Sequence, residues 1–372
     1  MVRKVLFQVH LWTGLTLGLV LALIGLSGSL LVYDHELLAL GDKPLPRAEA
    51  AGPALPLDIL IKTARAAVGG KTDSVTLVLP QKKGDAATVF MRKLGDKPGP
   101  KRDGERKAYT YVYLDPASGR VLDIRPSSLN PVLAFVHDFH GNFLMGREGR
   151  QVIGWFGVVM LLLGLSGIVL WWPKRGAWKF AFGVRKKAKG YLFYRDLHGA
   201  TGIWLWLVFI IVSFSGVVIA FPDTAKAMTG PAVQSFDPRR GPAVEALQGV
   251  KPLGADAAVA LVRAALPHAA ITTVALPLTK NDTIRVTLGT METGPVSVVY
   301  VDPYQRRIAG WRNPPSAPAG ERFAAWQRVL HAGEGWGPLW RALVCISGLL
   351  PLLFVITGTV MWLKTRRGRA LA

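Results

Sequence analysis

The sequence predicts a membrane protein: an all-α bundle of four transmembrane helices, with two external α+β modules inserted between them. Three observations support this fold class. Half of the 372 residues are hydrophobic, four long apolar runs are present, and the pattern of one half of the chain returns in the other. An apolar helix of about 20 residues crosses the ~30 Å hydrocarbon core of a bilayer. We therefore expect an internal duplication of the order helix, module, helix.

The four apolar runs cover residues 11–33, 152–172, 199–221 and 339–363, and the last contains Arg341 near one end and Pro351. They set the expected organisation of the chain. It comprises a first span (1–33), a first module (34–130), a pre-helix with the second span (131–173), a basic loop (174–195), a third span (196–222), a second module (223–318), a pre-helix with the fourth span (319–364) and a tail (365–372).

The net charge of +21 is concentrated beside the spans. The loop at 174–195 holds eight Lys and Arg residues and no acidic residue, so the positive-inside rule places it in the cytoplasm, with both chain ends on the same side. We therefore interpret the basic residues as topology signals and expect no nucleic-acid partner. A signal peptide over residues 1–29 is disfavoured, because the apolar part is too long and no small-x-small cleavage site follows. Cys345 stands alone, so no intramolecular disulfide forms.

Each external segment carries the pattern of a small α+β module. The first predicts a helix at 57–68 and strands at 74–79, 87–93, 108–114 and 120–124; the second predicts a helix at 255–266 and strands at 272–276, 283–288, 296–301 and 307–311. The motif YVYLDP at 111–116 matches VVYVDP at 298–303, and each is followed by a turn.

The repeat also aligns four of the seven histidines, without a gap. His10 aligns with His198, and Thr13-Gly14 and Ser27-Gly28 align with Thr201-Gly202 and Ser215-Gly216. His140 aligns with His331, and Ser166-Gly167 with Thr357-Gly358. We expect His10 and His198 to begin the two spans that enter from the cytoplasm, and His140 and His331 to end short helices (131–145 and 321–332) on the outer side.

Two pairs of histidines, one for each membrane face, point to haem. Two neutral imidazoles hold a six-coordinate haem iron, and a four-helix bundle supplies them from facing helices. Thr13-Gly14 and Thr201-Gly202 are small enough to leave room for a porphyrin ring. The alternative is that these are interfacial histidines tolerated at helix ends. Zinc is less favoured, because no Cys or carboxylate cluster accompanies either pair.

Weaker candidates surround these pairs. His137 is an alternative ligand one turn before His140, although its counterpart is Arg328, and His35 is a candidate for an outer haem or a substrate. Charged side chains near the histidine-bearing ends are candidates for haem propionates, and the alternative for them is an ordinary positive flank. They are Arg195, Arg147 and Arg341.

The motifs HLWTGL, YVYLDPASGRVL, HGNFLMGREGR and GLSGIVLWWPKR resemble the PepSY-associated transmembrane family, and the length and four spans are similar to its inner-membrane ferric siderophore reductases. The resemblance implies PepSY-like periplasmic modules and two haem b groups, with His10, His198, His140 and His331 as axial ligands. It also implies a bacterial inner-membrane location and electron flow outward. The segment HAGEGWGP at His331 is richer in glycine than its partner.

The function expected is reduction of siderophore-bound Fe(III) outside the membrane. No Gly-rich dinucleotide fingerprint is evident, so the donor is a separate cytoplasmic reductase or a quinol. External cations would contact the iron complex: Arg92, Lys101, Arg102, Arg106 and Lys107. Two alternatives remain open, namely an envelope binding or regulatory protein without redox activity, and a transporter of the siderophore or iron.

Overall fold

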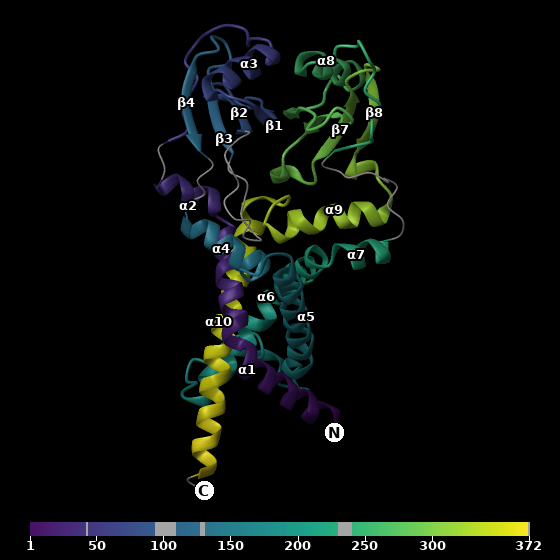
Figure 1. The fold of residues 1–372 in the computed structure, drawn as a ribbon. Helices are drawn as coiled ribbons and strands as arrows, with labels where there is room; N and C mark the ends of the chain where they lie inside the picture. The colour runs from purple at the N-terminus through teal and green to yellow at the C-terminus, as the bar shows by residue number, and fades with distance from the viewer. Residues whose placement is uncertain (42–43, 94–108, 127–130, 230–239, 371–372) are drawn as a thin grey trace. The chain divides into compact units, whose positions relative to one another are not determined.

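The computed structural model describes residues 1–41, 44–93, 109–126, 131–229 and 240–370, and the chain forms two compact units (Figure 1). The helical unit comprises Met1–Leu38, Val132–Met228 and Trp326–Ala372. The sheet unit comprises Ala39–Pro131 and Thr229–Ala325. Each unit is therefore assembled from segments that are distant in the sequence.

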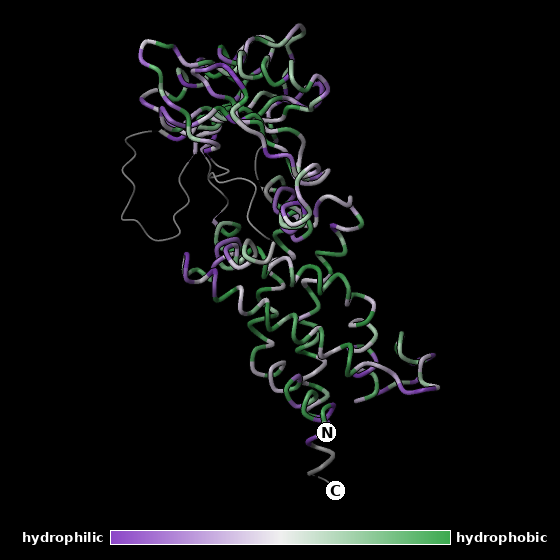
Figure 2. The backbone as a smooth tube through the Cα atoms, turned by 90° about the vertical axis from the view of Figure 1, so that its right-hand side faces the viewer, coloured by the Kyte–Doolittle hydropathy of each residue, from purple (hydrophilic) through white to green (hydrophobic). Residues whose placement is uncertain are grey.

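The helical unit contains α1 (Val2–Leu31), α5 (Gly146–Trp171), α6 (Tyr191–Ala220) and α10 (Gly337–Ala370). These four are long and apolar enough to cross a membrane, and Figure 2 shows hydrophobic residues concentrated along them. Helix α1 packs against α5 and α10, and α6 packs against the same two helices, so α1 and α6 lie diagonally in a four-helix bundle. Small residues allow close helix packing: a Cβ at Gly25 of α1 would collide with the backbone of Gly348 on α10.

All four helices begin earlier than the apolar runs, α1 and α6 by the largest number of residues. Helix α1 starts at Val2 and α6 starts at Tyr191, directly after Gly190 with its positive φ of 57°. His10 and His198 therefore lie inside the helices and not at their first residues. The reason is that an apolar run marks only the part of a helix that faces hydrocarbon. No Pro or Gly interrupts residues 2–10, so the helix continues into the polar flank.

Short helices connect to the bundle at the ends of the long ones. They are α2 (Asp34–Gly41), α4 (Pro131–Asn142), α7 (Pro222–Thr229) and α9 (Ala319–His331). Arg341 of α10 fixes the end of α1: its Nε and Nη2 donate to the carbonyl of Val32, at 3.0 and 2.7 Å, and its guanidinium pairs with Glu36. Arg341, a candidate for binding a haem propionate, thus stabilises the junction between α1 and α2.

Within the described residues, the sheet unit contains eight antiparallel strands in the order β4-β3-β2-β1-β5-β6-β7-β8. Their bounds lie within two residues of the expected ones. They are β1 (Thr72–Val78), β2 (Ala87–Lys93), β3 (Thr110–Leu114), β4 (Val121–Pro126), β5 (Ile271–Ala275), β6 (Ile284–Leu288), β7 (Ser297–Asp302) and β8 (Arg307–Arg312).

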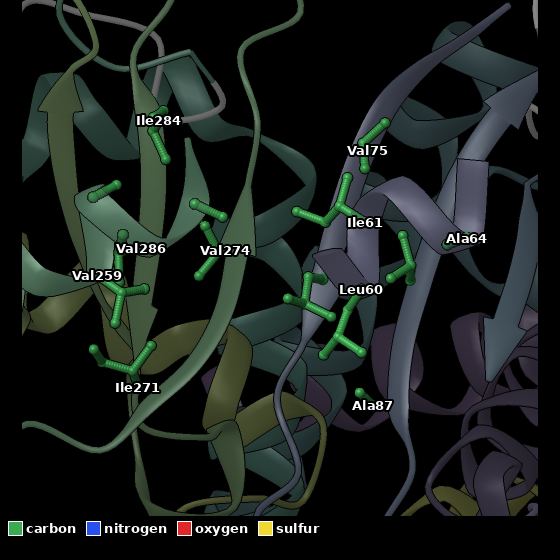
Figure 3. Packing of buried hydrophobic residues seen from close by; sticks show 14 of the residues in the cluster. Leu60, Ile61, Ala64, Val75, Ala87, Val259, Ile271, Val274, Ile284 and Val286 are labelled. Atoms are coloured by element: carbon green, nitrogen blue, oxygen red, sulfur yellow. The ribbon is translucent and has the colours of Figure 1, made fainter. Parts of the chain in front are cut away.

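The two expected modules form one continuous sheet rather than separate bodies. Strand β1 pairs with β5, and Leu77 lies opposite Val274. An unpaired edge strand exposes a row of N–H and C=O groups, and this pairing satisfies them. Helices α3 (Leu57–Val68) and α8 (Ala255–Ala265) cover the sheet, and their buried side chains belong to one hydrophobic core with those of the strands (Figure 3).

The first turns of α3 and α8 exchange hydrogen bonds. The Asp58 carboxylate of α3 accepts from the backbone N–H of Ala255 and of Asp256, at 2.8 and 3.3 Å. The Asp256 carboxylate of α8 accepts from the N–H of Leu57 and of Asp58, at 2.8 and 2.9 Å. Each acidic side chain therefore caps the N-terminus of the opposite helix, where orphan N–H groups and the helix dipole favour an anion.

A buried carboxylate organises the turn between β3 and β4. Asp115 accepts four backbone N–H bonds of about 3.0 Å, two from within its own turn and two from the linker at Glu49 and Ala50. These bonds, led by that from Ala50, hold the pKa of the Asp115 carboxyl well below its usual range. Asp302 begins the corresponding turn after β7 and accepts from the N–H groups of Tyr304 and Gln305.

We expect the sheet unit to lose stability in acid through Asp115. The folded-state pKa is depressed, so this contribution is complete above the unfolded value of about 4 and is lost as the pH falls below it. Asp115→Asn should cost about 1–3 kcal/mol at neutral pH and flatten the acid dependence. Hydrogen exchange of peptides from residues 109–126, measured between pH 7 and pH 3, checks this, and Glu245→Gln, an exposed change, is the control. An equally steep acid dependence in Asp115→Asn would contradict it.

Candidate functional site

Four histidines lie at two levels of the bundle. His10 of α1 and His198 of α6 are at one level; the rings of His140 (α4) and His331 (α9) reach Ile24 of α1 and Val212 of α6 at the other. The two levels are equally far apart on both helices: fourteen residues separate His10 from Ile24 on α1 and His198 from Val212 on α6, which is about 21 Å at 1.5 Å per residue.

His140 and His331 form the carbonyl-bonded pair, named for their hydrogen-bond acceptors. Nδ1 of His140 lies 3.0 Å from the carbonyl oxygen of Ile24, and Nδ1 of His331 lies 2.9 Å from that of Val212. The centres of the two imidazole rings are 6.0 Å apart, and the ring planes are inclined by 33°. Two imidazoles that bind one metal ion from opposite sides, each with a nitrogen–metal bond of about 2 Å, have ring centres about 6 Å apart. The separation therefore suits a single ion held between two histidines.

The hydrogen bonds identify the nitrogen that is left for a ligand. A backbone carbonyl only accepts, so Nδ1 of each ring must carry the proton, and Nε2 of the neutral imidazole keeps its lone pair. Burial lowers the pKa of His140 to about 4 and also lowers the pKa of His331, so both rings are neutral at pH 7. Both histidines of the pair are thus in the form that binds a metal.

Each of these two rings packs against a glycine of a long helix. A Cβ at Gly28 would lie 2.8 Å from Cε1 of His140, and a Cβ at Gly216 would lie 3.0 Å from Cε1 of His331. Any side chain at either position would displace the imidazole. The aligned Ser-Gly pairs at 27–28 and 215–216 therefore have a physical role, since the serine hydroxyls also contact Nδ1 of the two rings at 3.2 Å.

Different turns bring the two short helices back to the bundle. After α4 the turn uses Phe143 and Leu144, both with positive φ, followed by Gly146. After α9 it uses three glycines with positive φ, residues 333, 335 and 337. Glycine adopts this conformation with little steric cost. The glycine-rich segment after His331 is thus a second way to make the same reversal, and the two rings keep matching contacts.

His10 and His198 form the hydroxyl-bonded pair. Nδ1 of His10 lies 2.8 Å from Oγ of Ser166 on α5, and Nδ1 of His198 lies 2.7 Å from Oγ1 of Thr357 on α10. Each hydroxyl also donates within its own helix, Ser166 to Leu163 at 3.1 Å and Thr357 to Leu353 at 2.7 Å. Because the hydroxyl proton is used in that bond, the oxygen accepts from Nδ1–H. Nε2 again keeps its lone pair.

A buried carboxylate fixes the start of α6, two residues before His198. Asp196 accepts from Nε and Nη2 of Arg185, at 2.7 and 3.1 Å, and from Nη2 of Arg195 at 3.0 Å. The basic loop is therefore tied to the helix that carries His198. Arg195, a weaker candidate for a haem propionate, has its guanidinium on Asp196.

The remaining candidates have varied surroundings. His35 is exposed, and its ring lies 3.9 Å from Asp34. His137 lies one turn before His140 on α4, but the ring 6.0 Å from His331 is that of His140. Arg147 is exposed on α5. Arg92 pairs with Asp73 across β1 and β2, whereas Lys101, Arg102, Arg106 and Lys107 lie outside the described residues.

The chemistry of these donors suits haem better than a bare metal ion. Among the residues that the structure describes, no group of three or more His, Cys, Asp or Glu side chains comes together as a metal site. A porphyrin supplies four nitrogens of its own and needs only two axial ligands. Around the hydroxyl-bonded pair, a Cβ at Gly14 or at Gly358 would meet no atom within 4 Å, whereas a Cβ at Gly202 would lie 3.7 Å from Phe354. The residues of both pairs therefore fit a haem with two histidine ligands.

Comparison with known proteins places the chain in a family. The family model described as the PepSY-associated TM region matches residues 7–365, so the protein belongs to this family of multi-pass membrane proteins. This confirms the family resemblance seen in the sequence motifs. The chain is also 25% identical, over 265 residues, to the uncharacterised protein PA4219 of Pseudomonas aeruginosa. That alignment covers 63% of this chain and 64% of the relative, which is just under two thirds of its length.

Proposed function

We propose that this protein is a b-type dihaem electron-transfer protein of the bacterial inner membrane that reduces siderophore-bound Fe(III) on the periplasmic side. The observation that carries the proposal is the presence of two histidine pairs at two levels of one membrane bundle, each with Nε2 available. His10 and His198 would hold one haem, and His140 and His331 would hold the other.

Matching contacts support the internal duplication on which this arrangement rests. His10 bonds to a hydroxyl of the following span, and His198 does the same; His140 bonds to a carbonyl of the preceding span, and so does His331. The chance that unrelated segments repeat both contacts is small. The Ser166 to Thr357 difference preserves the hydroxyl, which is the group that the contact uses.

Charge supports the orientation. The segment at 174–195, which runs into the first turns of α6, carries eight basic residues, so the positive-inside rule favours a cytoplasmic side for the level of His10 and His198. The segments that form the sheet unit leave the opposite ends of the spans, and this supports a periplasmic side for His140 and His331. The two levels then lie near the two faces of the membrane.

The chain's own contribution is to hold and orient the ligands. Bound haem iron would supply one-electron transfer at each level. The Nδ1–H bonds fix the tautomer and the ring orientation of all four histidines, and the apolar helices exclude water from the site. Neither a protein nucleophile nor a general base is required. The substrate chemistry is release by reduction, since Fe(II) is held less strongly than Fe(III) by hard oxygen ligands. The electron donor would be a separate cytoplasmic reductase or a membrane quinol.

An absorption spectrum tests the proposal. We expect the detergent-purified protein, once reduced with dithionite, to show sharp α and β bands, and a pyridine haemochrome assay to give about two b-type haems per chain. Mixing the reduced protein with a ferric siderophore should then return the oxidised spectrum. A protein that stays colourless when it is expressed with added haem would overturn the proposal and favour an envelope binding protein without redox activity.

A further inference from the structure

The two histidine pairs differ in the group that accepts their Nδ1–H bond. At one level the acceptors are side-chain hydroxyls, of Ser166 and Thr357. At the other level they are main-chain carbonyls, of Ile24 and Val212. A side-chain acceptor can be altered by a single substitution, whereas a main-chain acceptor remains whatever residue occupies the position. A side-chain substitution can therefore remove the hydrogen-bond acceptor at the first level but not at the second.

We infer that Ser166 and Thr357 are positioning residues that set the reduction potential of the haem held by His10 and His198. This inference rests on the proposed haem ligation. An acceptor on Nδ1–H makes the imidazole a more basic ligand, and a more basic ligand stabilises ferric over ferrous iron. The hydroxyls thus lower the potential at this level, and they also fix which ring nitrogen faces the iron.

The bonding of the hydroxyls makes them effective acceptors. Each donates its own proton to a backbone carbonyl of its helix, Ser166 to Leu163 and Thr357 to Leu353. Donation of this kind raises the acceptor strength of the same oxygen, because hydrogen bonds in a chain polarise one another. The helix therefore fixes the rotamer of the hydroxyl, and the hydroxyl fixes the imidazole.

The serines near the other pair provide the contrast. Ser27 and Ser215 lie 3.2 Å from Nδ1 of His140 and His331, but each ring has a carbonyl closer, at 3.0 and 2.9 Å. Removal of the Ser27 hydroxyl leaves the Ile24 carbonyl in place. A serine in contact with a histidine should therefore matter at one level and not at the other.

The experiment is a potentiometric titration of the full-length dihaem protein, read by visible absorption and by electron paramagnetic resonance of the ferric haems. Ser166→Ala and Thr357→Val should raise one of the two midpoint potentials, change one ferric signal, and weaken the retention of one haem about 10- to 100-fold. Ser166→Thr and Thr357→Ser keep a hydroxyl and should restore the wild-type values. Ser347→Ala, which removes a buried hydroxyl bonded to the Val344 carbonyl within α10, is the control and should leave both potentials in place.

The outcomes separate this inference from the proposed function. Wild-type protein without haem would overturn both. Wild-type protein with two haems, but with both potentials unchanged in Ser166→Ala and Thr357→Val, would overturn the role of the hydroxyls and leave the proposed function standing. Equal shifts of both potentials, or an equal effect of Ser347→Ala, would also overturn the role, because they would show a general change in the bundle.

Discussion

Replacement of His331 by alanine is expected to remove one of two haems from the purified protein and to leave the other in place. His331 provides one of the two imidazoles of the carbonyl-bonded pair, and the ring of His140, 6.0 Å away, is the other. A single imidazole holds haem less firmly than a pair does. The pyridine haemochrome assay should fall from about two haems per chain to about one, and His140→Ala should give the same result.

The variants of the other level make the comparison specific. His10→Ala and His198→Ala should each remove the haem of the hydroxyl-bonded pair and leave that of the carbonyl-bonded pair, so a difference spectrum identifies which bands belong to which level. His35→Ala, the change of an exposed ring, should keep both haems. Equal loss of all haem in every single variant would instead indicate one shared site or general misfolding. It would contradict the assignment of two pairs.

A large stability effect in the sheet unit is also expected at the junction of its two halves. Asp58→Ala removes the cap of α8, and Asp256→Ala removes the cap of α3, because each carboxylate accepts from the opposite helix. Loss of an N-terminal cap costs about 1–2 kcal/mol, so each single variant should open the junction about 5- to 30-fold more often. The double variant should open the junction more often than either single variant does.

Hydrogen exchange in the full-length protein measures this effect locally. Peptides that cover residues 57–62 and 255–260 should exchange faster in both single variants, because the lost bonds belong to the helix opposite each mutated residue. Lys62→Ala changes an exposed residue of α3 and is the control, with an expected effect within about 0.5 kcal/mol. Faster hydrogen exchange confined to the mutated helix would contradict this prediction, because it would show that each aspartate caps its own helix and not the opposite one.

The sequence predicted the helices and strands well because their signals are local. Eight strands appear within two residues of the expected bounds, since alternation and the Asp-Pro turns at 115–116 and 302–303 depend on neighbours in the chain. The apolar runs located the four long helices but not the residues at which the helices begin. Helix α1 extends to Val2 because nothing in the polar flank breaks it.

Pairings between distant segments were not visible in the same way. The sequence suggested two modules, and the pairing of β1 with β5 makes them one sheet. Asp58 and Asp256 each cap the other's helix although they lie 198 positions apart, and no local sequence pattern predicts this pairing. Position alone makes Arg195 and Arg341 candidates for haem propionates, and the structure adds their carboxylate partners, Asp196 and Glu36.

The sequence by itself determined that four apolar helices cross a membrane and that four histidines recur in register, because length, hydropathy and repetition are properties of the chain alone. Only the tertiary structure decided which nitrogen of each ring is available and what accepts the proton of the other. Those acceptors lie on neighbouring helices, at Ser166, Thr357, Ile24 and Val212. Hydrogen bonds of about 3 Å form between helices only once the bundle has packed, and they turn aligned histidines into a site.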